Sequence, residues 1–239
     1  MGTHGGPDIV TDGLVLSLDA ANKKSYPGSG TAVKDLSGNS DSTLTNGPTF
    51  DTTFGGAKDF DGSNDKIVTP VTATNWADVA FTIQMWTSDC TASDSCFEMG
   101  GDGGTNNFGL VGFYWSTSNR IFSFWRAGGA GGSYGTYRGF RMEPPHTRTE
   151  PNNLCLTFTG VGGTNATTIV NNCTLYFNGI SQTVIHGGGG TPNTSGILEL
   201  GGSKYPLNGK IHKTLYYDRV LTAAEVLQNY NATKSRFGL

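Results

Sequence analysis

Short runs of alternating apolar residues, separated by turn residues, extend through the chain and constrain its fold more than any other feature. The clearest run is residues 81–86. In it, Phe81, Ile83 and Met85 alternate with Thr82, Gln84 and Trp86. This period of two residues is typical of a β-strand. Thirty-six glycines, with many Ser, Thr and Asn residues, supply the turns between runs. The 239 residues therefore predict one large all-β domain.

The C-terminal stretch adds the one helix that the sequence predicts. Residues 209–217 alternate as a strand, and the chain then breaks at Asp218-Arg219. Thr222 and Glu225 have the spacing of a capping box, and the residues that follow them give a helix with an apolar face. We expect a final strand followed by a short helix that packs on a sheet.

Charge and hydropathy exclude several classes of protein. Charged residues make up 15% of the chain and the formal net charge is −3, without the basic face of a nucleic-acid-binding protein. No apolar run reaches the length of a transmembrane helix. The Gly-rich residues 1–12 lack the features of a signal peptide, so we expect synthesis in a cytosol. We interpret residues 1–12 as a lead-in arm and 13–239 as the domain.

The four cysteines, Cys90, Cys96, Cys155 and Cys173, lack the Cys-x-x-Cys spacing of a zinc site. Cys90 and Cys96 lie in one polar loop and could bridge. Cys155 and Cys173 fall on strands that we expect to be neighbours, but their alternation places them on different faces. A cross-strand disulfide needs a common face, and cytosolic synthesis favours free thiols. Oxidation after release from the cell stays an alternative.

Four stretches resemble the laminin-G-like, concanavalin-A-like jelly-roll domains. Residues 59–67 resemble a hairpin of that family, 81–86 its core strand, 175–179 a second hairpin, and 209–226 its closing strand and helix. The resemblance implies a two-sheet antiparallel β-sandwich with jelly-roll topology and one short C-terminal helix. It also implies that the first strand pairs beside the last strand.

A narrower resemblance points to the virion proteins of tailed bacteriophages. Residues 13–22, 35–39, 45–50 and 229–238 are similar to that group, although Val33 stands where the group often has Trp. The resemblance implies a virion structural protein, made in the host cytoplasm, that decorates the capsid surface or belongs to a tail or fibre. Its partners would be other virion subunits, as a homo-oligomer or on a capsid or tail lattice.

Cationic and aromatic residues gather in the insertion at residues 127–153, which we expect to be irregular. Loops of this length are often functional, and Tyr and Arg are favoured at the centres of interfaces. We predict that this loop forms the contact surface. The candidate residues are Tyr134, Tyr137, Arg138, Arg141, His146 and Arg148.

The alternative function is a carbohydrate-binding adhesion module that recognises a host surface glycan. Aromatic rings stack on the apolar face of a sugar, while Asn and Asp side chains bind its hydroxyls. The glycan-binding candidates are Trp115, Trp125 and Tyr137. The competing interpretation is that each of these rings packs in the core, under loops or against a neighbouring subunit.

Catalytic and metal-binding patterns are weak in this sequence. Related jelly-roll glucanases carry a Glu-x-Asp-x-x-Glu strand, which this chain lacks, and we expect no two carboxylates to share one strand face. The histidines are scattered, and no Gly-x-Ser-x-Gly elbow occurs. We therefore predict a non-enzyme with no catalytic residue, and keep a glycan hydrolase as the weakest alternative.

Calcium is the one metal that the sequence suggests. Asp59, Asp61 and Asp65 surround Gly62 in a hairpin and could form a cation site. Aspartates also favour turns because they bond their own backbone, and the spacing lacks the rest of an EF-type loop. We favour the polar turn and expect no cofactor, with calcium as the alternative.

Overall fold

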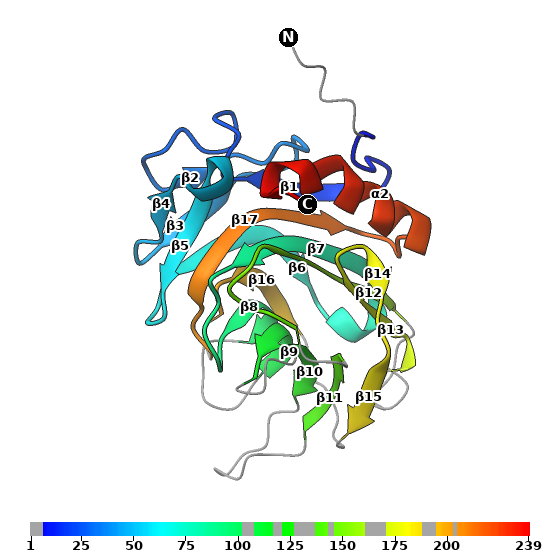
Figure 1. The fold of residues 1–239 in the computed structure, drawn as a ribbon. Coiled ribbons are helices and arrows are strands. Elements are labelled where there is room, and N and C mark those ends of the chain that lie inside the picture. Colours follow the sequence, from blue (N-terminus) through cyan, green and yellow to red (C-terminus); the bar gives the residue numbers. More distant parts are fainter. Residues whose placement is uncertain are drawn as a thin grey trace.

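The computed structural model describes residues 7–101, 108–116, 121–126, 137–142, 146–160, 171–187, 195–202 and 205–239 (Figure 1). Two antiparallel sheets form a sandwich, and the C-terminal helix, residues 223–233, lies outside it. The predicted all-β sandwich with a short C-terminal helix is confirmed. Among the described residues, no helix is long and apolar enough to cross a membrane.

The first sheet has eight strands. They are β1 (Leu14–Asp19), β4 (Thr49–Asp51), β5 (Ala57–Asp61), β7 (Ala80–Ser88), β12 (Asn152–Thr159), β13 (Cys173–Phe177), β14 (Ile180–Ser181) and β17 (Asn208–Tyr217). Their order is β14-β13-β12-β7-β17-β5-β4, and β1 also pairs with β17. The antiparallel pairing of β1 with β17 brings together the two ends of the domain, as expected.

The second sheet has nine strands. They are β2 (Ala32–Val33), β3 (Ser42–Thr45), β6 (Lys66–Ala73), β8 (Ser95–Gly101), β9 (Phe108–Trp115), β10 (Ile121–Arg126), β11 (Tyr137–Met142), β15 (Val184–Gly187) and β16 (Gly196–Leu200). Their order is β15-β11-β10-β9-β8-β16-β6-β3-β2. The expectation that residues 127–153 are irregular throughout is wrong, because β11 pairs with β10 and β15 inside that stretch.

Alternation along β7 explains why this strand lies at the centre of the first sheet. Phe81, Ile83 and Met85 are buried in the main core between the sheets. Gln84 points to the other side and is buried too, because its amide donates to a backbone carbonyl of the helix α2 (Ala223–Thr233). The strand is therefore covered on both faces, one by the second sheet and one by the helix.

The capping box that the sequence predicts begins α2. The Thr222 hydroxyl accepts a hydrogen bond from the Glu225 backbone, and the Glu225 carboxylate accepts one from the Thr222 N–H at 2.8 Å. Arg219 pairs with the same carboxylate at 2.7 Å and lowers the pKa of Glu225 to about 2. Val226 is buried beside Leu221, so the helix packs on the outer face of the first sheet (Figure 1).

The described part of the N-terminal stretch packs on the domain. Val10 is buried against α2, where its N–H donates to Asn229 at 2.8 Å. Its carbonyl accepts a hydrogen bond from the Tyr217 hydroxyl at 2.9 Å. Asp12 pairs with Arg219 at 2.9 Å. Residues 7–12 are therefore part of the layer that closes the first sheet.

Two short 3-10 helices complete the same outer layer. Phe54 in η1 (Thr53–Gly55) and Phe237 in η3 (Lys234–Phe237) lie 5.5 Å apart between ring centroids. Phe237 also stacks on Trp86 of β7, with centroids 4.0 Å apart. Arg236 joins the two helices, because its guanidinium donates to the Phe54 carbonyl and pairs with Asp19 at 2.7 Å. The C-terminal residues thus pack against the first sheet and η1.

Another 3-10 helix, η2 (Trp76–Asp78), precedes β7.

The stretch at residues 35–39 is a turn built around one buried carboxylate. Asp35 is 8% exposed, and one of its oxygens accepts from the backbone N–H of Ser17 at 2.8 Å and of Ser37 at 2.9 Å. Its other oxygen accepts from the N–H of Asn39 at 3.1 Å. The amide of Asn39 returns to the Val15 carbonyl at 2.8 Å. This motif therefore ties the first loop to β1.

Candidate functional site

The two sheets differ in what covers their outer faces. The helix α2, residues 7–12 and η3 close the outer face of the eight-stranded sheet (Figure 1). Within the part of the chain that the structure describes, no helix packs on the outer face of the nine-stranded sheet. Glu199, Tyr114 and Tyr205 are half-buried residues on or beside this sheet.

Two carboxylates lie opposite each other on this outer face. Glu98 of β8 pairs in register with Glu199 of β16. Their neighbours along each strand, among them Phe97 and Leu198, are buried in the main core, so the glutamates point outward. Directly opposed residues of an antiparallel pair have Cβ atoms about 5 Å apart. The two carboxylates therefore share one face of the sheet from neighbouring strands, an arrangement that was not predicted from the sequence.

A loop and a lysine position the two carboxylates. Glu98 is 7% exposed, and its Oε1 accepts a hydrogen bond from the Tyr205 N–H at 3.3 Å. Gly202 lies against the same oxygen with φ +64°, and a Cβ there would stand 3.0 Å from it. The ammonium of Lys66 lies 3.4 Å from both oxygens of Glu199. Glu98 is thus buried and bonded to the Tyr205 backbone, whereas Glu199 is half-buried.

Two tyrosines lie beside the carboxylates. The rings of Tyr114 and Tyr205 meet edge to face, with centroids 5.0 Å apart and an interplanar angle of 70°. Both side chains are half-buried, so part of each ring remains accessible. The Tyr205 carbonyl accepts from the Ser95 N–H at 3.0 Å, which fixes the loop to the start of β8. We call Glu98, Glu199, Lys66, Tyr114 and Tyr205 the acidic–aromatic face.

The interface candidates do not form one described surface. Tyr134 lies outside the described residues. Tyr137, Arg138 and Arg141 are placed on β11, but their side chains are outside the description.

The two remaining interface candidates contact their own domain. His146 stacks on Phe177 with ring centroids 3.8 Å apart, and burial lowers the pKa of His146. The Arg148 guanidinium donates to the Ser116 carbonyl at 3.3 Å. Both side chains therefore contact their own domain, although the buried Nε2 of His146 has no hydrogen-bond partner among the described residues.

One glycan-binding candidate is corrected by the structure. Trp115 is fully buried and belongs to the main core, because β9 turns this side chain inward. It cannot stack on a sugar while the domain is folded. Trp125 lies on β10 and Tyr137 on β11, two paired strands, but their side chains lie outside the described residues.

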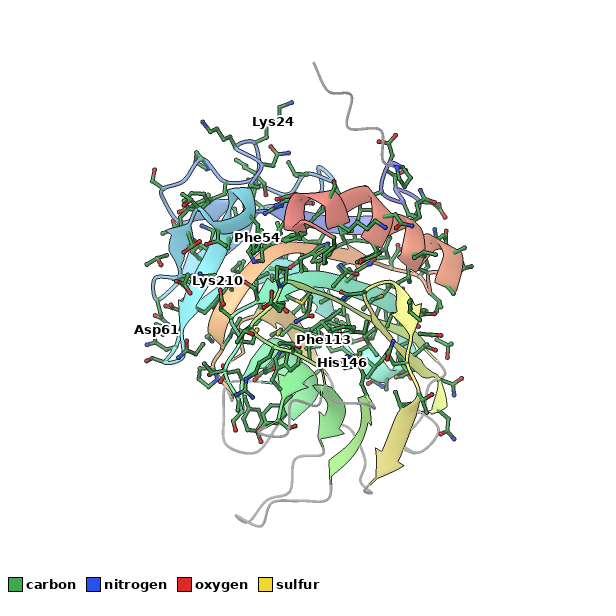
Figure 2. All side chains as sticks on the ribbon, in the orientation of Figure 1. Lys24, Phe54, Asp61, Phe113, His146 and Lys210 are labelled. Carbon is green, nitrogen blue, oxygen red and sulfur yellow. The ribbon has the colours of Figure 1, made fainter. Side chains whose placement is uncertain are left out.

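The three aspartates of the β5–β6 hairpin form a turn. Figure 2 shows Asp61 at the outer tip of this hairpin, where its carboxylate accepts from the Ser63 N–H at 2.8 Å. Asp65 is 4% exposed and accepts from the Asp61 N–H at 3.1 Å. Burial raises the pKa of both Asp59 and Asp65. Among the described residues, no three His, Cys, Asp or Glu side chains are grouped to hold a metal ion.

A lysine inside the sandwich was missed by sequence reasoning. Lys58 of β5 is 2% exposed, and its ammonium lies 2.7 Å from the centroid of the Tyr26 ring. Among the described residues, the Lys58 Nζ and the Thr214 Oγ1 have no hydrogen-bond partner, and both residues line a cavity of about 10 Å³. Burial lowers the pKa of Lys58 to about 7.

All four cysteines are buried free thiols. Cys155 packs in the cluster under α2, whereas Cys173 belongs to the main core, so they point to opposite faces of the first sheet. The prediction that their faces disagree is confirmed. Cys90 and Cys96 both lie in the main core.

Comparison with known proteins agrees with this architecture. The model of a family described as the concanavalin A-like lectin/glucanases superfamily matches residues 61–227. No curated protein sequence matches the chain.

Three solved structures are similar at low sequence identity. Trypanosoma rangeli sialidase in complex with 2,3-difluoro-KDN has 15% identity and a TM-score of 0.61, over 95% of this chain and 34% of the sialidase. Domain 4 of AbnA, an extracellular arabinanase from Geobacillus stearothermophilus in complex with arabinotriose, has 16% identity and a TM-score of 0.58, over 91% and 98%. The binding domain of botulinum neurotoxin DC, in complex with rat synaptotagmin II, has 14% identity and a TM-score of 0.60, over 93% and 52%.

The chain thus spans about a third of the sialidase and half of the neurotoxin domain, and nearly all of the AbnA domain. At these identities the likeness concerns the fold alone.

Proposed function

Because the chain belongs to the concanavalin A-like lectin/glucanases superfamily, we propose that it is a lectin-like module that binds a glycan without cleaving it. The observation that carries the proposal is the acidic–aromatic face, on the sheet surface that no described helix covers. Carboxylates accept hydrogen bonds from sugar hydroxyls, and aromatic rings pack against the apolar face of a sugar. The AbnA domain, similar over nearly its whole length, was solved with arabinotriose.

The placement of each group supports its part in binding. Glu98 is held by a backbone N–H, so one oxygen is fixed before a ligand arrives. A preorganised acceptor loses little conformational entropy on binding. Tyr114 and Tyr205 hold each other at an angle, which presents an edge and a face to a ligand.

The contacts of the glutamates favour binding over hydrolysis. A glycosidase needs one carboxyl group that donates a proton and a second that acts as nucleophile or base. Glu98 accepts a hydrogen bond from a backbone N–H and Glu199 pairs with the ammonium of Lys66, so both side chains already serve as hydrogen-bond acceptors. We therefore propose that the pair orients hydroxyl groups and that the protein is not an enzyme.

A glycan array with the purified chain, followed by calorimetry on the best ligand, tests this proposal. Glu98→Gln and Tyr205→Ala should each weaken binding by about tenfold or more, which corresponds to the loss of one good polar or stacking contact. Glu150→Gln is the matched control, since Glu150 is exposed outside this face and should bind as wild type does. Absence of binding to every glycan, or unchanged affinity in both variants, would refute the proposal. Release of sugar products would refute the non-enzymatic part.

A second candidate role is a structural part in the virion of a tailed phage, as capsid decoration or as a tail or fibre component. It is supported by the similarity of residues 13–22, 35–39, 45–50 and 229–238 to virion proteins. In that role the chain would be made in the host cytoplasm and bound to other virion subunits. Glycan binding would then serve attachment to the host surface.

Electron cryomicroscopy of native particles tests the virion role. Regular copies on a capsid or tail lattice would support it. If mass spectrometry does not detect the chain in the particles, the virion role is excluded. Glycan binding would then be tested separately.

A further inference from the structure

The thiols of Cys90 and Cys96 meet inside the sandwich. Cys90 follows the end of β7, and Cys96 is the second residue of β8. Their exposed fractions are 2% and 0%, and both side chains belong to the main core between the sheets. The Cys90 thiol donates to the Ser88 carbonyl at 3.6 Å, and Cys96 is its neighbour in the core. A short loop thus places two buried thiols near each other.

The loop that joins the two strands holds this arrangement. Asp89 and Ser93 have φ angles of 54° and 75°, a left-handed conformation that turns the backbone sharply on both sides of the loop. The Asp94 carboxylate accepts from the Thr91 N–H at 3.1 Å and from the Thr91 hydroxyl at 2.6 Å. It also accepts from a backbone N–H at the start of β17, at 3.0 Å. These bonds fix the loop in the shape that brings the thiols together.

Each cysteine is also fixed by its own backbone. The Cys90 N–H donates to the Arg148 carbonyl at 3.2 Å, and the Cys96 carbonyl accepts from the Gly201 N–H at 2.9 Å. Two thiols that the native state holds in contact have a high effective concentration toward each other. Folding should therefore favour a bond between them.

We propose that Cys90 and Cys96 are a redox pair that closes to an intramolecular disulfide in an oxidising medium and reopens in a reducing one. With oxidised glutathione as the oxidant, one cysteine thiolate attacks a glutathione sulfur, which forms a mixed disulfide and releases one glutathione thiolate. The second cysteine thiolate then attacks the cysteine sulfur of the mixed disulfide and releases the second glutathione. Two protein thiols are oxidised, one glutathione disulfide is reduced, and the two protons pass to the released thiolates.

The bond would connect the end of β7 to the start of β8. Glu98 lies two residues after Cys96 on the same strand, so the disulfide would tether the strand that carries it. The neighbouring Cys90 thiol and burial raise the pKa of Cys96, which makes exchange in the folded state slow. The equilibrium constant of the disulfide should therefore be measured after refolding, when exchange has reached equilibrium. The proposal does not depend on glycan binding.

The test uses a Cys155→Ala/Cys173→Ala variant, which leaves only the proposed pair. The variant is refolded in glutathione buffers of graded ratio, and also incubated in concentrated guanidinium chloride. Alkylation and peptide mass spectrometry give the equilibrium constant for the disulfide in each solvent. The constant in the folded protein should be about tenfold or more larger than in the unfolded chain.

The converse variant, Cys90→Ala/Cys96→Ala, supplies the matched control. Its Cys155 and Cys173 point to opposite faces of the first sheet, so folding should suppress their disulfide. Circular dichroism confirms that both variants fold. If folding does not raise the constant for Cys90 and Cys96, or raises that of the control pair equally, the proposal is overturned.

Discussion

Replacing Lys58 by methionine should stabilise the protein, and the gain should depend on pH. Lys58 is 2% exposed, and its ammonium has no hydrogen-bond partner in the part of the chain that the structure describes. Burial lowers its pKa from 10.5 to about 7. This difference corresponds to about 5 kcal/mol between the charged and neutral forms. Methionine fills a similar volume and needs no proton or hydrogen bond.

The direction of the pH dependence follows from the number of protons that the folded and unfolded states bind at Lys58. Between pH 7 and 10.5 the unfolded chain binds a proton at Lys58 that the folded protein has released, so wild-type stability rises with pH through this group. Below pH 7 both states are charged, and the folded protein bears the full cost of the buried ammonium. The advantage of Lys58→Met should thus be largest below pH 7 and should shrink above it.

The ring of Tyr26 opposes this effect. An ammonium over an aromatic face in a desolvated site gains about 2 kcal/mol, which favours the charged form. We therefore expect Lys58→Met to be more stable than wild type by about 1–4 kcal/mol at pH 6.5. The difference should decrease by up to about 1.4 kcal/mol per pH unit between pH 7 and 9.

Urea unfolding of both proteins across this pH range measures the difference directly, and other titrating groups cancel in it. Lys24→Met is the control, since Lys24 projects into solvent (Figure 2) and should show neither the gain nor the slope. A wild type more stable than Lys58→Met at pH 6.5, or a difference that does not change with pH, would refute the reasoning.

Three further predictions concern the outer layer and the first loop. Burial lowers the pKa of His212 to about 4, so its contribution to stability is complete above pH 6.5 and falls by about 3 kcal/mol as the pH drops through 4. The unfolding free energies of wild type and His212→Gln in urea should therefore diverge in that pH window. A difference between the two that stays constant with pH would contradict this. Phe237→Ala removes the stack on Trp86 and should cost about 3 kcal/mol in urea unfolding, whereas the same change at exposed Leu239 should cost almost nothing. Asp35→Ala leaves buried N–H groups unpaired and should lower stability by about 3 kcal/mol, with Asp35→Asn recovering part of it; equal losses in the two would count against the bonding described.

The elements with a strong local signal could be predicted from the sequence. The alternation in β7 and the Thr222–Glu225 spacing depend on neighbours in the chain, and both elements form as expected. The polar turn favoured for Asp61 and Asp65 likewise follows from local bonding. The burial of Trp115 was harder to predict. Phe113, two residues earlier, has a φ of 54°, and this irregular backbone interrupts the alternation of inward and outward side chains along β9.

The acidic–aromatic face could not be predicted because its geometry comes from the topology. Glu98 and Glu199 become neighbours only when β16 pairs between β6 and β8, and no local pattern encodes that order. The buried Lys58 poses the same difficulty, since alternation alone places a lysine on the polar side of a strand.

The unequal covering of the two sheets explains where polar side chains remain available for binding. On the first sheet, the amide of Asn229 in α2 donates to Gln84 and to the Tyr217 hydroxyl, so these polar groups are used in packing. On the second sheet, Glu98 and Glu199 point outward from a strand pair whose inner residues fill the core. The first sheet is therefore covered by its outer layer, whereas the second sheet carries the carboxylates that we propose as ligand-binding groups. Variants in the outer layer should change stability and leave glycan affinity unaltered, whereas variants in the acidic–aromatic face should change affinity at nearly constant stability.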